Sequence, residues 1–410
     1  DGIADTKNPA EDLKKLLAWP SIASKNWVYR QYDHQVRDGS VVLPGSDAAV
    51  IRIKADSLPD LGSATVPVAS DGVSPPERTV GGTPTVAGET PALPKNSFLE
   101  KLIAMTVDCT GVYVFLDPYE GGKIAVAEAC RNLACSGAVP LGATDNLNFG
   151  NPHKPELFWQ LKESVRGLAE ACKFFNAPVT GGNCSLYNQN PNGPIDPTPT
   201  VAVVGLIGKL EHVTTQWFKD EGDAIILLGE IVDASDPIFG LGGSAYLQVV
   251  HGKKTGSPPR CDLEIAKTLH TTLLGLIQSG LVKSAHDCSE GGLAVCLAES
   301  CISQLVARET PRLIGAQIDL TKWEGRRVAD PKIRCDVLLF GETQSRIVIS
   351  CNALDAVKAV ERAKLLGVPA MQIGKVGGDK LTIKIAGEEF SAPLAELHDV
   401  WWNSIARAMA

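Results

Sequence analysis

Carboxylate and amide side chains gather in one short stretch near the middle of the chain. Residues 142–152 read GATDNLNFGNP, which places Asp145 among three asparagines and two glycines. Asn, Asp, Gly and Pro are also the ordinary turn residues, so this stretch taken alone predicts a loop between two helices as readily as a binding site. The rest of the sequence has to decide between these two interpretations.

A second stretch, PVTGGNCSLYN at residues 178–188, combines glycines with polar side chains at the end of a short apolar strand. Gly181 and Gly182 permit a nucleotide to approach the backbone closely. Asn183 offers an oxygen to a hard cation, and Ser185 can donate a hydrogen bond to a phosphate or an amide. A turn explains this stretch equally well when it is taken alone.

Three further stretches carry titratable residues but are weaker signals. DPYEGGK at 117–123 precedes a predicted helix, where glycines and the helix N-terminus could hold a phosphate, although a turn followed by a helix cap is the simpler interpretation. AHDCSEGGLA at 285–294 reads as a strand-to-helix passage with Ser289 as a possible N-cap, and FGETQSR at 340–346 reads as a turn before a strand. A hydrogen-bonded structural role is favoured for His286. We assign no catalytic residue, and in particular not Asp117, Lys123 or His286.

The predicted elements around these stretches mix helices and strands throughout. The helix at 155–175 is the best supported, because Pro155 suits its first turn and an apolar stripe follows one face: Leu157, Leu161, Val165, Leu168 and Cys172. The other predicted helices are 122–138, 262–280, 290–303, 353–366 and a tail helix with Trp401 and Trp402. The predicted strands are 47–54, 104–109, 112–116, 200–208, one within 221–230, 336–340 and 345–350. This alternation predicts an α/β (α+β) fold class.

The chain is long enough for two or three domains. We predict an N-terminal lead-in at 1–24, a first domain at 25–212 and a second domain at 220–410. Residues 57–97 are rich in Pro, Gly, Thr and Ser, which is typical of a surface insertion without a packed core.

Composition excludes several classes of function. Of the 410 residues, 44% are hydrophobic and 21% are charged, and the formal net charge is -8 without a basic cluster, so we expect no nucleic-acid partner. No apolar run is long enough for a bilayer and the N-terminus has no signal pattern, so we expect no membrane association and a cytoplasmic location. The 11 cysteines include no C-x-x-C pair, and we expect buried, reduced thiols.

Taken together and in order, the motifs resemble the large subunit of phosphoribosylformylglycinamidine synthase, the amidine-forming enzyme of purine biosynthesis. The stretches that carry the resemblance include SKNWVYRQYDHQV, LPGSDAAVIRIK, AMTVDC, GATDNLNFGNP, PVTGGNCSLYN, LGGSAYLQVVHGK, AHDCSEGGLAV and LFGETQSR. The resemblance implies a domain similar to the N-terminal domain of AIR synthase, followed by one similar to its C-terminal domain. It covers only the second half of the family's duplicated architecture. Because the sequence begins with Asp1, we expect a fragment or a processed product.

The resemblance also implies the reaction and the site. The family uses ATP and Mg²⁺ to convert formylglycinamide ribonucleotide and glutamine-derived ammonia to formylglycinamidine ribonucleotide. Matching residue by residue, Asp145 and Gly182 would bind ATP, Asn183 would bind the metal, and Ser185 would bind the substrate. The implied partners are the missing N-terminal half, a glutaminase subunit, a small bridging subunit, and a second domain of the first type with which this chain pairs or homodimerises.

Two hypotheses of different class remain open. The chain is either an incomplete part of this ATP-dependent C–N ligase, or a non-catalytic nucleotide-binding scaffold of the same superfamily. A selenophosphate synthase or a thiamine-phosphate kinase is a lesser alternative, and residues 1–50 lack the cysteine that the former requires.

Overall fold

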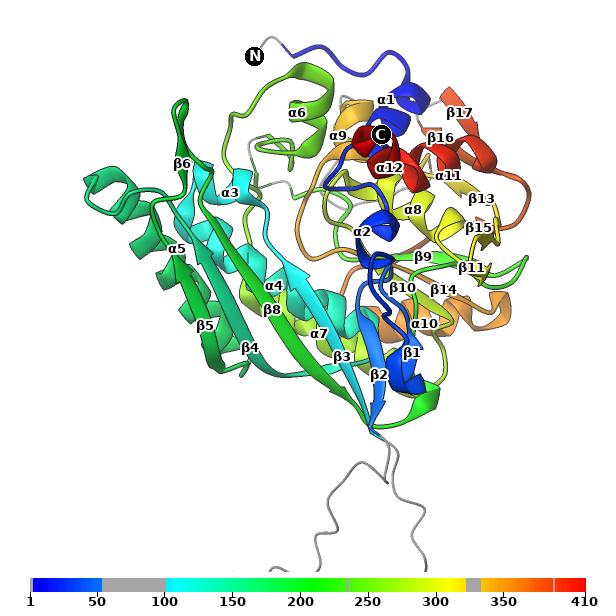
Figure 1. The fold of residues 1–410 in the computed structure, drawn as a ribbon. Helices are drawn as coiled ribbons and strands as arrows, with labels where there is room; N and C mark the ends of the chain where they lie inside the picture. The colour runs from blue at the N-terminus through cyan, green and yellow to red at the C-terminus, as the bar shows by residue number, and fades with distance from the viewer. Residues whose placement is uncertain (1–2, 54–100, 234, 237, 322–332, 386–387) are drawn as a thin grey trace, which may run out of the picture.

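Two mixed β-sheets and the helices packed on them form the fold (Figure 1). The computed structural model describes residues 3–53, 101–233, 235–236, 238–321, 333–385 and 388–410. The insertion predicted at 57–97 lies outside the described residues. The mixed sheets with packed helices confirm the predicted α/β (α+β) class.

The first sheet has six strands in the order β1-β2-β3-β8-β4-β5. Its strands are β1 (Ser40–Val42), β2 (Ala49–Ile53), β3 (Lys101–Asp108), β8 (Thr198–Ile207), β4 (Val139–Asn148) and β5 (Val179–Ser185). Strands β4 and β5 run parallel, whereas the other neighbouring pairs are antiparallel. A short hairpin, β6 (Gln189–Asn190) and β7 (Gly193–Pro194), projects beyond the end of this sheet (Figure 1).

Two long helices, α4 (Pro118–Cys135) and α5 (Pro155–Phe174), pack against each other on one face of the first sheet. The helix predicted at 155–175 is therefore confirmed. Of the predicted stripe, Leu157, Leu168 and Cys172 are buried, but Leu161 is only half-buried and Val165 is 39% exposed, while Ser164 is buried. Helices α4 and α5 lie so close together at this point that a Cβ on Gly122 of α4 would overlap the Ser164 carbonyl oxygen of α5. The small side chain of Ser164 therefore faces α4 where an apolar side chain was expected.

The second sheet has seven strands in the order β10-β14-β9-β15-β13-β16-β17. They are β10 (Ser284–Asp287), β14 (Ile347–Cys351), β9 (Ala224–Leu228), β15 (Ala370–Val376), β13 (Ala316–Asp319), β16 (Lys380–Ile385) and β17 (Glu388–Pro393). The helices of this part are α6 (Ala245–His251), α7 (Leu263–Gln278), α8 (Gly292–Ile302), α9 (Cys335–Phe340), α10 (Ala356–Leu365), α11 (Leu394–Trp402) and α12 (Ser404–Met409). A small ladder pairs β11 (Leu305–Ala307) with β12 (Thr310–Pro311).

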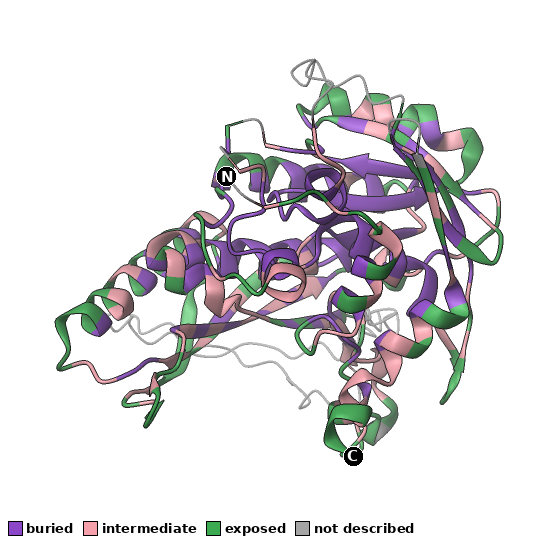
Figure 2. Cartoon of the chain, turned by 90° about the horizontal axis from the view of Figure 1, so that it is seen from above, coloured by how far each residue is buried: buried purple, intermediate pink, exposed green. Residues whose placement is uncertain are grey.

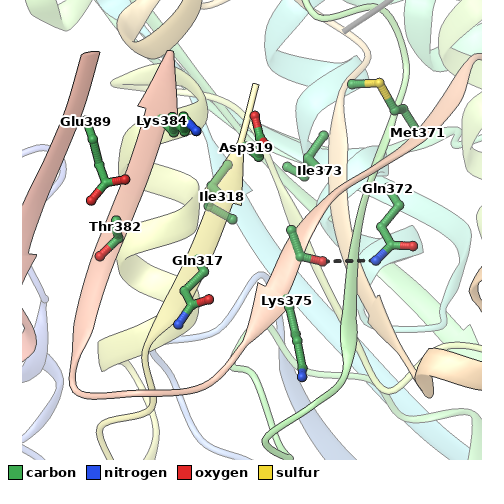
Figure 3. A pocket seen from close by; sticks show the side chains of 11 residues that line it. Gln317, Ile318, Asp319, Met371, Gln372, Ile373, Lys375, Thr382, Lys384 and Glu389 are labelled. Atoms are coloured by element: carbon green, nitrogen blue, oxygen red, sulfur yellow. Dashed lines mark hydrogen bonds between the residues drawn. The ribbon is translucent and has the colours of Figure 1, made fainter. Parts of the chain in front are cut away.

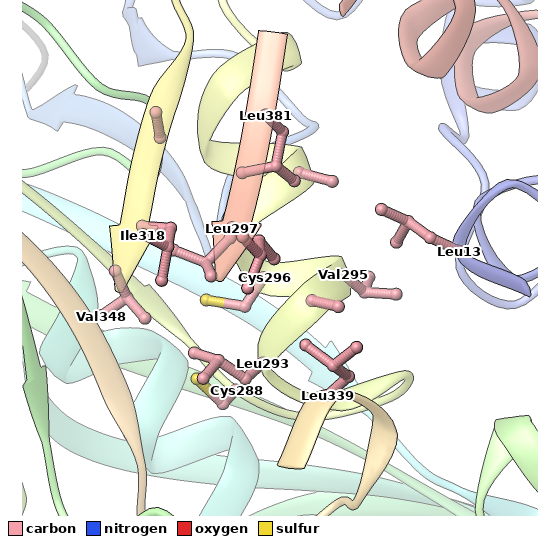
Figure 4. Packing of buried hydrophobic residues seen from close by; sticks show 14 of the residues in the cluster. Leu13, Cys288, Leu293, Val295, Cys296, Leu297, Ile318, Leu339, Val348 and Leu381 are labelled. Carbon is pink, nitrogen blue, oxygen red and sulfur yellow. The ribbon is translucent and has the colours of Figure 1, made fainter. Parts of the chain in front are cut away.

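Strands β9 and β14 are buried on both faces, which explains their continuous apolar sequences. Ile225, Leu227 and Val348 join one core cluster with α8, whereas Ile226 and Ile349 join another with α7 and α10. Figure 4 shows the first of these clusters, in which α8 contributes Leu293, Val295, Cys296 and Leu297. Figure 2 shows that the buried residues are concentrated in the interior and that exposed residues lie at the periphery.

The N-terminal segment belongs to the second sheet's core. Leu13 and Leu16 of α1 (Pro9–Leu17) are fully buried in the cluster of α8. After the short helix α2 (Asn26–Tyr29), the chain crosses to the first sheet. The backbone N–H of Ser24 donates to the Trp401 carbonyl (3.1 Å), so both ends of the chain meet in this part of the fold.

Two predicted strands are wrong. Residues 112–116 lie in a helix, α3 (Gly111–Leu116), and residues 336–340 lie in α9. Both are apolar runs too short for periodicity to separate helix from strand. All five residues at 336–340 are buried, so α9 shows no polar face that could reveal its helical period. Among the described residues, no helix is both long enough and apolar enough to span a membrane.

Candidate functional site

The residues predicted to bind nucleotide, metal and substrate meet at one edge of the first sheet. Residues 142–148 lie in strand β4 rather than in a connecting loop, and residues 179–185 form the edge strand β5. The parallel register pairs Asp145 with Gly182, and it pairs Asn148 with Ser185. Two stretches more than 30 residues apart in sequence are thus brought side by side by strand pairing.

The pleat divides these residues between the two faces of the sheet. Leu147 packs against the core beneath the helices, so Asp145 shares the helix-covered face because side chains alternate along a strand. Asn146 and its partner Asn183 lie on the opposite, open face. A ligand that touches both Asp145 and Asn183 must therefore cross the free edge of β5.

Asp145 occupies the space that a side chain at position 182 would need. A Cβ added to Gly182 would overlap the Asp145 Oδ1 atom. Partial burial raises the pKa of the Asp145 carboxyl above its ordinary value. Glycine at position 182 thus leaves the carboxylate room at the sheet edge.

Hydrogen bonds from asparagine side chains fix the polar groups on the open face of the sheet. The Nδ2 atom of Asn183 donates to Oδ1 of Asn146 (2.8 Å). The Nδ2 atom of Asn188 donates to the Ser185 carbonyl (2.8 Å) and to the Ser185 Oγ (3.2 Å). The amide oxygen of Asn183 and the hydroxyl of Ser185 are therefore presented by side chains and backbone that are already fixed.

The DPYEGGK stretch has a structural role. Asp117 caps α4 by accepting a hydrogen bond from the Glu120 N–H (3.0 Å), and Lys123 pairs with Glu120 (3.0 Å). Gly121 and Gly122 lie inside α4 rather than before it, and both face backbone atoms of neighbouring helices. These glycines therefore serve helix packing, which agrees with the simpler interpretation of this stretch.

His286 is part of a buried ion-pair network between the two sheets. Its Nδ1 lies 3.0 Å from Asp47 Oδ1, and its Nε2 lies 3.0 Å from Glu299 Oε2. Burial alone would lower the pKa of the His286 imidazole, but these two carboxylates raise it well above its ordinary value. Asp47, His286 and Asp287 place possible metal ligands within 4.8 Å of one another, yet both His286 nitrogens already face carboxylates. This geometry supports the structural role predicted for His286.

Arg131 and Glu342 also belong to this buried charged region between the two sheets, which we call the seam together with Asp47, His286 and Asp287; sequence reasoning missed Arg131. The fully buried Arg131 contacts Asp287 Oδ2 through Nη2 (3.0 Å) and Gln344 through Nη1 (3.2 Å). Glu342 accepts hydrogen bonds from the Tyr113 hydroxyl and from the Gly291 N–H (2.7 Å). Burial raises the pKa of Glu342 to about 8. No sequence signal reveals the contacts of Arg131 with Asp287 and Gln344, or of Tyr113 with Glu342, because these residues are more than 150 positions apart in the sequence.

Ser289 is not the N-cap of α8. Gly291 occupies that position with φ 77°, and the Ser289 hydroxyl instead points to Asp287 Oδ1 (3.4 Å).

A groove of 760 Å³ lies elsewhere, over strands β13, β15, β16 and β17 of the second sheet (Figure 3). Its lining mixes cationic Lys375 and Lys384 with anionic Asp319 and Glu389. None of the predicted site residues lines it. The sheet edge at β4 and β5 therefore remains the candidate site.

Comparisons with known proteins place the chain in a family. The profile of the AIR synthase related protein, N-terminal domain, matches residues 96–207, and the profile of the C-terminal domain of the same proteins matches residues 220–386. The chain is 41% identical over 408 residues to the phosphoribosylformylglycinamidine synthase subunit PurL of Anaeromyxobacter sp. (strain K), an alignment that covers 98% of this chain and 46% of that protein. It is 47% identical over 352 residues to the subunit PurL of Thermosynechococcus vestitus, with 84% of this chain and 39% of that protein covered. The chain thus spans about half the length of the curated relatives it matches.

Solved structures share the fold. T. maritima PurL complexed with FGAR superposes with a TM-score of 0.59 at 18% identity, covering 73% of this chain and 46% of that chain. T. maritima PurL complexed with ATP gives a TM-score of 0.55 at 19% identity, covering 73% of this chain and 44% of that chain. From these matches we conclude that the chain belongs to the AIR synthase related proteins, and that within them it is similar to the phosphoribosylformylglycinamidine synthase subunit PurL.

Proposed function

We propose that this chain is the second half of an ATP-dependent phosphoribosylformylglycinamidine synthase. In that reaction ATP phosphorylates the formamide oxygen of formylglycinamide ribonucleotide, and ammonia then displaces the phosphate to give the amidine. The observation that carries the proposal is the parallel pairing of β4 with β5, which aligns Asp145, Gly182, Asn183 and Ser185 at one sheet edge. Such positioning of polar groups supplies most of the catalysis in phosphoryl transfer.

The ATP-binding role rests on Asp145 and Gly182. Asp145 Oδ1 fills the space that a Cβ at position 182 would need, so glycine at 182 leaves the carboxylate in place and the strand edge free of a side chain. Asp145 would accept hydrogen bonds from the nucleotide, and the exposed strand at Gly182 would let the nucleotide approach the backbone.

The donor set at Asn183 fits Mg²⁺. Because Nδ2 of Asn183 donates to Asn146, its amide oxygen is the atom left for a ligand, and hard oxygen donors are what Mg²⁺ prefers. When bound, Mg²⁺ would neutralise charge on the transferred phosphate. Ser185 lies two residues further along β5, so its side chain is on the same face as that of Asn183, and its hydroxyl would donate to the substrate.

The open face of the first sheet supports pairing with another domain of the same kind. Val107 is 66% exposed and Leu141 is 53% exposed, and Met105 and Val139 lie on the same uncovered face. Contiguous exposed apolar side chains on a sheet mark an interaction surface. We propose that a homologous domain covers it, supplied by the first half of the enzyme or by a second copy, and that a glutaminase subunit and a small bridging subunit complete a cytoplasmic assembly.

Calorimetric titration with Mg-ATP tests the site. Asp145→Asn and Asn183→Ala should each weaken Mg-ATP binding about tenfold or more, because the first replaces a charged hydrogen-bond acceptor by a neutral one and the second removes the proposed oxygen ligand of Mg²⁺. Their melting temperatures should stay near that of the unaltered chain, since both side chains lie at the surface edge. Asp355→Asn, in the second sheet's region, is the matched control and should leave the affinity unchanged.

Activity is tested in the complete enzyme, with ammonium, ATP and formylglycinamide ribonucleotide as substrates. Unaltered Mg-ATP affinity in both variants would remove the site assignment. Nucleotide binding without turnover in the complete enzyme would instead favour the non-catalytic scaffold.

A further inference from the structure

Tyr187 has an unusual backbone conformation directly beyond the candidate site. It follows Ser185, the last residue of β5, by two positions, and its φ angle is 61°. This left-handed conformation is uncommon for residues other than glycine, asparagine and aspartate, and it is costly for a bulky side chain. Strain of this kind clusters at functional sites.

Hydrogen bonds to the end of β4 hold the strained residue. The Tyr187 N–H donates to the Gly150 carbonyl (3.2 Å), and the Asn188 N–H donates to the Phe149 carbonyl (3.0 Å). Asn188 adds a side-chain bond from Nδ2 to the same Phe149 carbonyl (3.2 Å). The loop after β5 is thus tied to the loop after β4, and Tyr187 cannot relax into an ordinary conformation without breaking these bonds.

Little of the Tyr187 side chain is buried, so burial contributes little free energy to offset the backbone strain. The side chain is 54% exposed, and the ring contact it makes is with His153, at 6.1 Å between ring centroids. Phe239 is the other aromatic residue with positive φ among the described residues, but its ring packs against the large core cluster. Burial can offset the strain at Phe239, whereas glycine would serve the backbone better than tyrosine at position 187.

The place of the ring suggests its use. Tyr187 and His153 flank the carboxyl ends of the parallel strands β4 and β5, the end of a strand pair at which ligands commonly bind in α/β sheets. An exposed tyrosine offers a flat apolar face together with a hydroxyl that can donate or accept a hydrogen bond.

We infer that Tyr187 contacts the substrate beside Ser185, packing its ring against the ribose of a phosphorylated ribosyl amide. This inference rests on the proposed function, because it takes formylglycinamide ribonucleotide as the ligand of Ser185. The contact is made in the bound substrate and in the transition state alike. Removing the ring therefore raises KM and leaves kcat nearly unchanged.

Tyr187→Gly separates this role from a structural one, because it removes both the ring and the strain. We expect KM for formylglycinamide ribonucleotide to rise about tenfold, with kcat within about twofold, in the complete enzyme. The melting temperature should stay equal or rise, because glycine adopts φ 61° without the steric strain that tyrosine has there. Tyr187→Phe, which keeps the ring, should change KM less than about threefold.

Asn176→Gly is the matched control. Asn176 also has positive φ (54°) but lies just after α5, before β5 begins. It should relieve strain without any effect on KM.

Steady-state kinetics and thermal unfolding of the three variants decide the matter. An active parent enzyme whose KM is unchanged by Tyr187→Gly would overturn the inference and leave the proposed function standing. A lower melting temperature for Tyr187→Gly would also overturn it, since the ring would then be serving the fold. A complete parent enzyme that neither binds nor converts formylglycinamide ribonucleotide would overturn the proposed function and this inference with it.

Discussion

Replacing Gly121 by alanine tests whether the glycines of DPYEGGK serve packing. A Cβ on Gly121 would lie 2.5 Å from the backbone nitrogen of Val114 and 2.6 Å from its Cα. Ordinary contacts begin near 3.4 Å, so α3 and α4 would have to separate by roughly 0.9 Å at the closest contact. Alanine gains roughly 1 kcal/mol over glycine inside a helix, but overpacking of this kind costs about 1–3 kcal/mol. Because backbone meets backbone, the upper end of that cost applies, and we expect a net loss of about 1–2 kcal/mol in the free energy of unfolding.

The matched control is Gly275→Ala in α7. A Cβ there would meet only the tip of the Arg362 side chain, at 3.9 Å. The same substitution should therefore stabilise the protein by about 0.5–1 kcal/mol, the helix propensity gain alone.

Urea unfolding followed by circular dichroism gives the stability of each variant. Two sheets need not unfold together, so hydrogen exchange of the α3 and α4 amides should accompany it. Exchange in α3 and α4 should accelerate in Gly121→Ala, while Mg-ATP affinity stays the same. A Gly121→Ala protein as stable as Gly275→Ala would refute the packing argument. Loss of Mg-ATP binding without loss of stability would assign Gly121 to a ligand site instead.

Three other predictions concern the buried seam and the N-terminal helix. Arg131→Met should lower the free energy of unfolding by about 3–5 kcal/mol in urea titrations, because it leaves the Asp287 carboxylate buried without its cation, and a loss below about 1 kcal/mol would contradict this. Glu342→Gln should flatten the pH dependence of stability. The folded carboxyl, with its pKa raised to about 8, keeps its proton while the unfolded one ionises, so the parent loses stability as pH rises from about 5 to 8. Equal slopes for both proteins in denaturation at pH 5, 6.5 and 8 would show that Glu342 titrates normally. Leu13→Ala should cost about 3 kcal/mol by leaving a cavity in the core, and calorimetric melting should show no such loss if α1 is a loose lead-in.

The sequence predicted long elements well and short ones poorly. Helix α5 was predictable because its apolar positions recur over five turns and Pro155 marks its start. The six-residue helices α3 and α9 were predicted as strands, since one and a half turns of apolar residues carry no usable period. Residues 142–148 looked like a loop because their composition is that of turns, whereas pairing on both sides makes them a strand.

The candidate site was predictable as a set of residues but not as a geometry. The resemblance named Asp145, Gly182, Asn183 and Ser185, and strand pairing brings them together. Their division between two sheet faces depends on the register irregularity between Ala143 and Thr144, which no composition reveals. Tyr187 has no sequence signal at all, since its distinctive property is a backbone angle.

The burial of α1 against α8 constrains how this chain can fold during synthesis. Helix α1 is synthesised before the two sheets, but Leu13 and Leu16 reach their final partners only after α8, nearly 300 residues later, has been made. Until α8 has been made, Leu13 and Leu16 of the amphipathic helix α1 lack their packing partners and stay exposed, while the strands of the first sheet can already pair. The last step is a closure in which the start of the chain joins strands and helices encoded at its far end. The second sheet and its helices expressed without α1 would therefore lack part of their hydrophobic core, although the two sheets look like separate units along the sequence.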